Sequence, residues 1–133
     1  MLMPPISRYM TRQPWTIRRD VPLSKAKEMM RDHHIRHLPV LDGGNLVGVI
    51  SERDILQVER FQHLGDQFVV EDAMTEDVYT VDFHEATDTV VEAMAEHKYG
   101  SVVVRNRGNQ IEGIFTTVDA MQVLAELLRR EVA

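Results

Sequence analysis

The sequence repeats itself once, and this internal repeat limits the possible folds more than any other feature. Met10-Thr11 recurs as Met74-Thr75, an offset of 74 − 10 = 64 positions. Residues 48–54 recur as residues 113–119, an offset of 113 − 48 = 65, because the turn before the second segment is one residue longer. A chain with such self-similarity is expected to consist of two copies of one structural unit.

Each copy predicts the same order of elements, β-α-β-β-α. In the first copy we expect an extended segment at 15–17, a helix at 23–34, a hairpin of strands 38–41 and 46–50, and a helix after Ser51. In the second copy the elements lie at 78–81, 86–98, 101–104, 111–115 and 118–132. The apolar residues of the helices recur at steps of three and four, and β-branched runs flank Gly and Asn at the hairpin turns. One copy cannot bury its sheet alone, so we expect the two to pack on each other.

The repeats also set the expected organisation of the chain. Repeat 1 is placed at residues 1–60, a linker at 61–69 and repeat 2 at 70–133. The segment 57–70 is interpreted as the end of a helix followed by a turn.

Composition argues against several classes of protein. Hydrophobic residues make up 44% of the 133 residues, which is enough to form a core. No apolar run approaches the roughly 20 residues that span a bilayer, and the first residues lack the features of a signal peptide. The absence of cysteine rules out disulfides and suits a reducing cytoplasm, so we expect a cytoplasmic protein without a membrane partner. The net charge of −6 argues against nucleic acid as a partner, although arginines gather in the first third of the chain.

A Ser/Thr-x-x-Asp motif stands at the start of the last helix in each copy, as Ser51-x-x-Asp54 and Thr116-x-x-Asp119. A helix N-terminus exposes free N–H groups and the positive end of its dipole, which suits an anion. A carboxylate one turn into the helix can accept hydrogen bonds from both ribose hydroxyls. The same motif is close to a capping box, which would only stabilise the helix. The two roles are compatible.

The chain resembles the CBS (cystathionine-β-synthase-type) domain family over nearly its whole length. Three features carry the resemblance. They are the two Met-Thr segments, Ile6–Thr11 and Val70–Thr75; the run Ile35–Asp42; and a Gly-apolar-apolar-Ser/Thr-x-x-Asp motif that occurs twice. Their order and their near-constant spacing make the resemblance specific.

The resemblance implies an α/β fold in which two CBS repeats, related by a pseudo-two-fold axis, pack as one Bateman module that commonly forms homodimers. It also implies a regulatory ligand in clefts between the repeats: AMP, ADP, ATP, S-adenosylmethionine or an NAD-type compound. By resemblance, site one combines Pro14, Trp15, Thr16, Ile35, Arg36 and His37 with Thr116 and Asp119. Site two combines Val78, Tyr79, Thr80, Tyr99, Gly100 and Ser101 with Ser51, Arg53 and Asp54.

The two predicted sites differ in charge. Arg36 and His37 are suited to bind phosphate, and site two has Gly100 and Ser101 at the matching positions. In site two, Arg53 partly compensates for the missing positive charge, where the other copy has Val118. We therefore expect a phosphorylated ligand to favour site one, with site two empty or occupied by a less charged ligand.

Several side chains keep two interpretations. Trp15 and Tyr79 could stack on adenine or pack in the core. His33, His34 and His37 are close in sequence, but no HExxH motif or carboxylate set completes a metal site, so we expect no bound metal. Four residues of the final helix share one face of it: Met121, Leu124, Ala125 and Leu128. Part of this face should cover the sheet, and the rest could pair with a second subunit.

We therefore expect a stand-alone regulatory sensor that requires no cofactor, forms a homodimer and acts through another, unidentified effector protein. The alternative is a structural dimerisation module that binds no ligand. A catalytic role is not expected, because the sequence shows no nucleophile–base pair and no Walker-type glycine loop.

Overall fold

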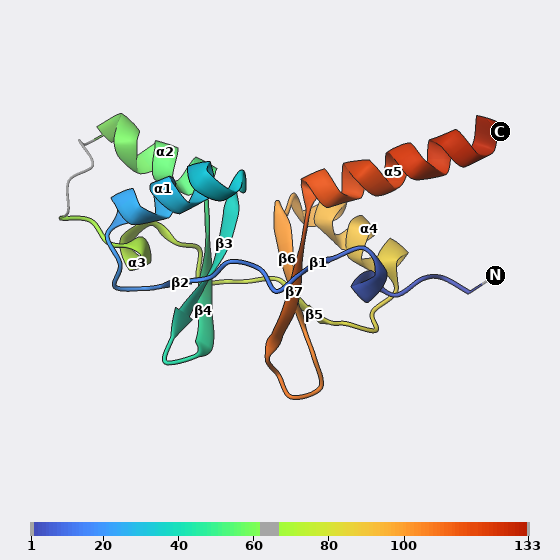
Figure 1. Cartoon of the computed structure of the whole chain (residues 1–133), viewed down its shortest axis with the longest axis horizontal. Coiled ribbons are helices and arrows are strands. Elements are labelled where there is room, and N and C mark those ends of the chain that lie inside the picture. Colours follow the sequence, from blue (N-terminus) through green and yellow to red (C-terminus); the bar gives the residue numbers. More distant parts are fainter. Residues whose placement is uncertain (1, 62–66, 133) are drawn as a thin grey trace. The chain divides into compact units, whose positions relative to one another are not determined.

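The computed structural model describes residues 2–61 and 67–132, which form two compact units. Unit 2 is continuous and comprises Trp15–Val78. Unit 1 combines the N-terminal segment Met1–Pro14 with Tyr79–Ala133. Figure 1 labels the helices and strands of both units.

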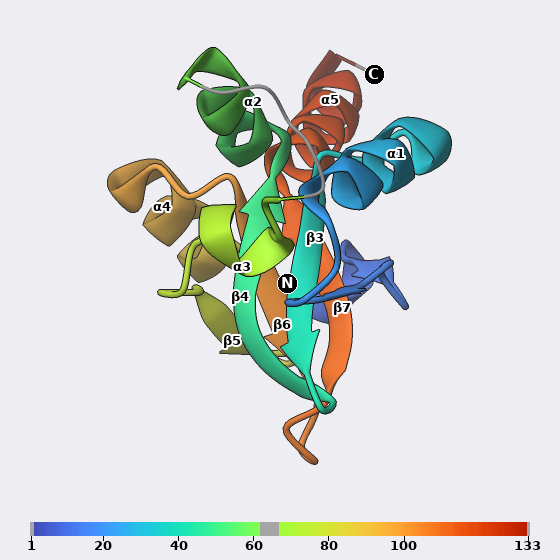
Figure 2. The same cartoon turned by 90° about the vertical axis from the view of Figure 1, so that its left-hand side faces the viewer.

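Unit 2 is a small sheet with helices packed on it. The strand order is β2-β3-β4, with β2 (Ile17–Arg18) parallel to β3 (His37–Asp42) and β3 antiparallel to β4 (Asn45–Ser51). The helices are α1 (Leu23–His33), α2 (Glu52–Phe61) and the single turn α3 (Val70–Ala73). Figure 2 shows all three beside the β3–β4 hairpin. Their shared core consists of Ile17, Leu23, Ala26, Met30, Leu38, Val40, Ile50, Ile55 and Val70.

Local sequence explains the shape of these elements. Leu23, Ala26 and Met30 are buried at helical spacing, so α1 packs one apolar face on the sheet. The helix ends at His33, and the left-handed backbone of the next residue, His34 (φ 55°), caps it. In the hairpin turn both Gly43 (φ 56°) and Gly44 (φ 85°) have the positive φ angles that a tight two-residue turn requires.

Unit 1 repeats this plan. Its sheet has the order β1-β7-β6-β5. The strands are β1 (Thr11–Arg12), β5 (Thr80–Asp82), β6 (Ser101–Arg105) and β7 (Ile111–Thr116), and the helices are η1 (Ile6–Arg8), α4 (Thr87–His97) and α5 (Thr117–Val132). Strands β5 and β6 are parallel, and the other pairs are antiparallel. The core of this unit consists of Ile6, Met10, Val90, Met94, Val102, Val104 and Phe115.

Each Met-Thr segment packs on the hairpin of the opposite repeat. In unit 1, Thr11 pairs with Ile114 of β7, and a Cβ on Gly113 would lie 2.6 Å from Met10 Sδ and 2.8 Å from Thr11 O. In unit 2, Thr75 exchanges two backbone hydrogen bonds with Val49 of β4, at 2.9 and 3.0 Å. A Cβ on Gly48 would lie 2.7 Å from Met74 Sδ and 2.9 Å from Thr75 O. The glycine of each hairpin is therefore needed for the close approach of a Met-Thr segment.

The structure confirms the predicted helices and hairpins to within two residues at most ends. The extended segments begin later than predicted, at Ile17 and Thr80. Three short elements were not predicted: η1, β1 and α3. Residues 62–66 of the predicted linker lie outside the described residues.

The packed face of α5 differs from the predicted one. Ala120 and Val123 pack on the core of unit 1, whereas Met121, Leu124 and Leu128 are 65%, 47% and 53% exposed. The helix is apolar on more than one side, so its periodicity does not identify the inner face. The start of the helix, directly after β7, decides which residues turn toward the core.

Candidate functional site

In unit 2 the Ser-x-x-Asp motif forms a reciprocal cap at the start of α2. The Ser51 N–H donates to Asp54 Oδ2 at 2.9 Å, and the Asp54 N–H donates to Ser51 Oγ at 3.1 Å. The next residue, Glu52, donates its N–H to the carbonyl of Arg36 at 2.8 Å. These bonds fix the carboxylate of Asp54 and the segment before β3 against the same helix start.

Unit 1 contains the same arrangement at the start of α5. The Thr116 N–H donates to Asp119 Oδ2 at 2.8 Å, and the Asp119 N–H donates to Thr116 Oγ1 at 3.4 Å. Thr117 donates its N–H to the carbonyl of Gly100 at 3.1 Å. The capping interpretation of both motifs is therefore confirmed.

Capping leaves part of each carboxylate available. Within residues 2–61 and 67–132, no hydrogen bond reaches Asp54 Oδ1, and Asp119 Oδ1 receives only a long one, from Thr11 Oγ1 at 3.5 Å. An ionised carboxylate accepts up to about four hydrogen bonds. Each motif thus presents an oriented, partly buried acceptor at the positive end of a helix, which suits the hydroxyl groups of a sugar.

The parallel strands bring the other predicted residues to the same edge. Because β2 runs parallel to β3, with Ile17 opposite Val40, Trp15 and Thr16 lie beside the Ile35–His37 segment at the start of both strands. In unit 1, Thr80 lies opposite Val103, and the Val103 N–H donates to the Tyr79 carbonyl at 3.0 Å. Val78–Thr80 and Tyr99–Ser101 therefore lead into neighbouring strands.

The charged groups of these edges differ between the units. Arg36 and Arg53 are exposed at the start of α2, whereas Gly100 and the exposed Val118 occupy the matching places in unit 1. His37 lies opposite Ser51 in the β3–β4 pair.

Burial lowers the pKa of His37, and the neighbouring Arg36 guanidinium acts in the same direction. The carboxylates of Asp54 and Glu52 oppose this shift. The lowered pKa favours the neutral form of His37 near pH 7, so the positive charge of this edge comes from Arg36 and Arg53.

The aromatic residues also differ. Trp15 is 53% exposed, so it is not a core residue, and its ring stacks on His33 with centroids 3.8 Å apart and planes inclined by 11°. Tyr79 is half-buried against the unit 1 core and stacks on Tyr99 at 4.8 Å. Partial burial raises the pKa of Tyr79, and Glu85 and Tyr99 add to the effect. Core packing is thus the better description of Tyr79 but not of Trp15.

The two units divide the predicted site residues differently from the two predicted sites. Unit 2 holds Trp15, Thr16, Ile35, Arg36 and His37 together with Ser51, Arg53, Asp54 and Val78. Unit 1 holds Pro14, Tyr79, Thr80, Tyr99, Gly100, Ser101, Thr116 and Asp119. The predicted combination of residues from both repeats in one site stays a prediction. The sequence did not lead us to predict that His33 stacks on Trp15. A signal was present, because a second histidine, His97, recurs 97 − 33 = 64 positions later, and its ring centroid lies 5.2 Å from that of Tyr99.

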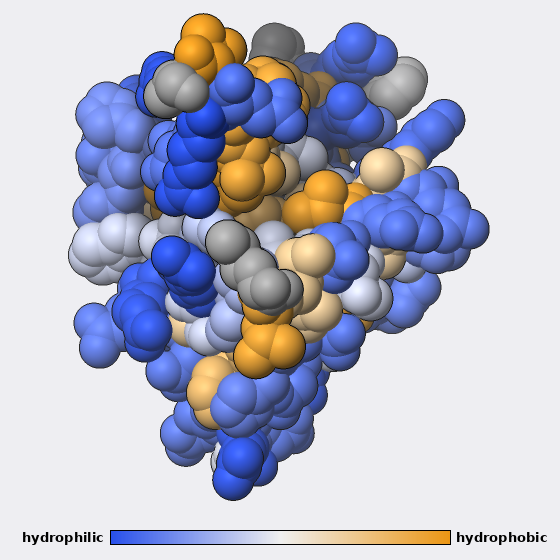
Figure 3. All heavy atoms as spheres, turned by 90° about the vertical axis from the view of Figure 1, so that its right-hand side faces the viewer, coloured by the Kyte–Doolittle hydropathy of each residue, from blue (hydrophilic) through white to orange (hydrophobic). Residues whose placement is uncertain are grey.

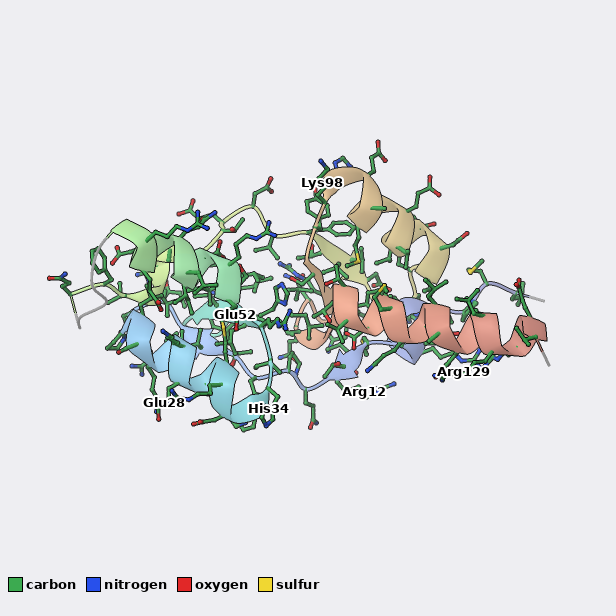
Figure 4. All side chains as sticks on the ribbon, turned by 90° about the horizontal axis from the view of Figure 1, so that it is seen from above. Arg12, Glu28, His34, Glu52, Lys98 and Arg129 are labelled. Carbon is green, nitrogen blue, oxygen red and sulfur yellow. The ribbon has the colours of Figure 1, made fainter. Side chains whose placement is uncertain are left out.

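The three clustered histidines take separate places. His33 contacts Trp15, His34 is the exposed cap of α1 (Figure 4), and His37 lies at the start of β3. Within the described ranges, no group of three His, Cys, Asp or Glu residues is arranged to hold a metal ion. Over the same residues, no helix combines the length and the apolar character needed to cross a bilayer.

Known proteins resemble this chain in sequence and in structure. The family model described as CBS domain matches residues 6–60 and 70–126. A solved structure described as an acetoin utilization protein (AcuB) from Vibrio cholerae has a TM-score of 0.85 and 30% identity, with 99% of this chain and 98% of that chain covered. The CBS domain pair of protein MJ0100, solved with 5′-methylthioadenosine and S-adenosyl-L-methionine, has a TM-score of 0.85 and 25% identity, with 94% and 98% covered.

The curated relatives are longer proteins. An uncharacterized protein of Methanocaldococcus jannaschii (MJ1232) is 29% identical over 111 residues, which are 84% of this chain and 36% of that protein. Inosine-5′-monophosphate dehydrogenase of Korarchaeum cryptofilum is 30% identical over 97 residues, which are 73% of this chain and 19% of that enzyme. The chain thus spans about a third and a fifth of these relatives. The matched part occurs in enzymes and in CBS-pair chains of this size.

Proposed function

Because this chain belongs to the CBS domain family as a tandem CBS pair, or Bateman module, we propose that it is a regulatory module that binds adenine nucleotides or related adenosyl ligands. The observation that carries this proposal is the pair of capped carboxylates, Asp54 and Asp119. Each is oriented by its helix start and keeps acceptor capacity that the cap does not use. A ribose with two adjacent hydroxyl groups matches such an acceptor.

The surroundings of the carboxylates suggest the rest of the ligand. In unit 2 two exposed arginines, Arg36 and Arg53, flank the start of α2, where N–H groups and the helix dipole favour an anion. This combination suits AMP, ADP or ATP. In unit 1 the matching positions carry no charge, which suits an adenosyl ligand without phosphate. The MJ0100 pair, which was solved with two such ligands, supports the second class.

The proposed action is regulatory. A ligand that binds one conformation more tightly than another shifts the population toward it, and an effector protein would respond to that shift. No residue of the chain is given a catalytic role. The bound molecule is a regulatory ligand and not a cofactor.

A thermal-shift panel tests the proposal. The purified chain is measured with AMP, ADP, ATP, S-adenosylmethionine, NADH and GTP at fixed salt. A ligand at about 100 times its dissociation constant adds about 2.7 kcal/mol to the free energy of unfolding, which raises Tm by several degrees. A rise with one adenine ligand and none with GTP is the expected result. No rise with any of them favours the structural alternative.

We also propose that the chain forms a homodimer, and the exposed face of α5 supports this. Six apolar residues of this helix are 47–88% exposed: Val118, Met121, Leu124, Leu127, Leu128 and Val132. Figure 3, a view onto the end where α5 terminates, shows apolar surface among hydrophilic side chains. Apolar patches of this kind often mark protein contacts.

Light scattering coupled to gel filtration tests the dimer. Leu124→Glu should yield monomers, while Gln122→Glu, an exposed change of equal charge on the same helix, should keep the mass of the wild type. A wild-type chain that is monomeric at all concentrations contradicts the proposal.

A further inference from the structure

Trp15 is the only tryptophan of the chain, and its exposure is unusual. The residue is 53% exposed, although a large aromatic ring is normally mostly buried. The ring is nevertheless oriented, because it lies almost parallel to the imidazole of His33, with centroids 3.8 Å apart and an angle of 11°. One face of the indole is thus occupied, and the exposure of the residue leaves other parts of the ring open to solvent.

The backbone on both sides of this stack is well anchored. His33 is the last residue of α1, where the His34 N–H donates to the Arg31 carbonyl at 3.4 Å and the Ile35 N–H donates to the Met30 carbonyl at 3.0 Å. Trp15 precedes Ile17, which is buried in the unit 2 core and starts the parallel pairing with β3. His33 therefore stacks on Trp15 from a fixed helix end.

We infer that His33 is a positioning residue, which holds the Trp15 ring so that its open face stacks on the purine base of the ligand. This inference rests on the proposed function and adds the residues that select the base. A bicyclic purine overlaps an indole more fully than a pyrimidine does, and stacking of a base on an aromatic side chain strengthens binding.

Unit 1 does not offer the same platform. Tyr79, at the position that matches Trp15, stacks on Tyr99 and packs against the unit core, and His97, which matches His33, contacts Tyr99 instead. Base stacking on an exposed ring is therefore a property of unit 2, on the edge that also carries Arg36.

Intrinsic fluorescence tests the inference, because Trp15 is the sole indole. AMP and CMP are titrated into the full chain, with AMP binding measured independently by calorimetry. AMP should alter the fluorescence of wild type and protect Trp15 from acrylamide quenching. His33→Ala should weaken AMP binding about 2- to 10-fold, the worth of one aromatic pair. His33→Phe, which keeps a flat ring, should restore it, and His97→Ala should have no effect on the Trp15 signal.

The outcomes separate the inference from the function on which it rests. If AMP binds wild type and His33→Ala equally, or binds without protecting Trp15 from acrylamide, the inference is wrong and the proposed function stands. If calorimetry shows no binding of any adenine nucleotide or adenosyl ligand of the panel, or of 5′-methylthioadenosine, to the wild type, both are wrong. A preference for AMP over CMP that survives Trp15→Leu also overturns the inference. The acrylamide result on wild type decides the matter even if His33→Ala does not fold.

Discussion

The two units share one framework and differ at their functional edges. In both, a Met-Thr segment lies against a hairpin glycine, and a Ser/Thr-x-x-Asp motif caps the helix that follows the hairpin. At the edges, unit 2 has exposed Arg36, Arg53 and Trp15, whereas unit 1 has Gly100, Val118 and the half-buried Tyr79.

This difference separates the residues that serve the fold from those that are candidates for ligand choice under the proposed function. Positions whose contacts are the same in both units are explained by packing and capping. Under the proposed function, positions that differ in charge and exposure, on equivalent backbone, are the ones that set which ligand each unit accepts. Substitutions at matched positions can therefore break or sharpen the comparison.

The largest effect is expected at the hairpin glycines. Gly48→Ala and Gly113→Ala should each lower the free energy of unfolding by about 1–3 kcal/mol, because the added methyl group would lie within 3 Å of a methionine sulfur and a backbone carbonyl. Chemical denaturation measures the change. Gly108→Ala is the control, because among the described residues the one atom within 4 Å of an added Cβ would be Asn106 Oδ1, at 3.3 Å. If only one of the two substitutions lowers the free energy of unfolding, the frameworks of the two units are not equivalent.

The capping carboxylates should affect both stability and binding. Asp54→Ala and Asp119→Ala each remove a cap, with an expected loss of about 1 kcal/mol of unfolding free energy, and should weaken adenosyl-ligand binding by at least about tenfold. Asp54→Asn and Asp119→Asn keep an oxygen for the cap but lose the charge, so affinity should fall with a smaller change in stability. If stability drops and affinity does not, the motifs are caps alone.

Arg36 should distinguish phosphorylated from unphosphorylated ligands. Arg36→Gln is expected to weaken AMP binding about tenfold, the effect of one charge-assisted hydrogen bond, and to leave 5′-methylthioadenosine unaffected. Arg129→Gln on α5 of unit 1 changes the net charge equally and should alter neither affinity in calorimetry at fixed salt. Equal losses for the two ligands would show that Arg36 does not read the phosphate.

The smallest effect is a pH dependence from His37, which has no titratable counterpart in unit 1. Because the folded-state pKa of His37 is lowered, the unfolded chain binds more protons at pH values between the folded-state and the unfolded-state pKa. The free energy of unfolding therefore rises with pH over that interval. The contribution is fully present above about pH 6.5 and is lost as the pH falls through the lower, folded-state pKa. His37→Gln should flatten this dependence in urea unfolding from about pH 8 to 5. A constant difference between wild type and His37→Gln over that range contradicts the assignment.

Much of this structure follows from local sequence. The helix and strand spans, the Gly43-Gly44 turn and the capping by Ser51 and Thr116 depend on neighbours a few residues apart, so their patterns predict them. The packing of Met10 on Gly113 does not, because its partner is far along the chain and the local pattern carries no record of it. The elements η1, β1 and α3 were missed for the same reason, since tertiary contacts hold them.

The candidate site was predicted in part. The capping carboxylates were predicted from the motif, and the structure adds their orientation. The ligand-binding roles of these carboxylates and of Arg36 stay predictions. The neutral state of His37 was not foreseen, because it depends on burial. Part of the face with Met121, Leu124 and Leu128 was expected to cover the sheet, and this was wrong, because Ala120 and Val123 pack on the core instead. Apolar residues lie on more than one side of α5, so the sequence alone did not separate the two faces.

Calorimetric titration of AMP into the purified wild-type chain, at fixed salt and with ADP, ATP, NADH, S-adenosylmethionine and 5′-methylthioadenosine measured in parallel, tests the central claim most directly. The proposed function predicts saturable binding of at least one of these ligands, with AMP binding reduced by Arg36→Gln. No binding of any of these ligands to a chain that circular dichroism shows to be folded would contradict it, and would leave a CBS pair whose role is structural.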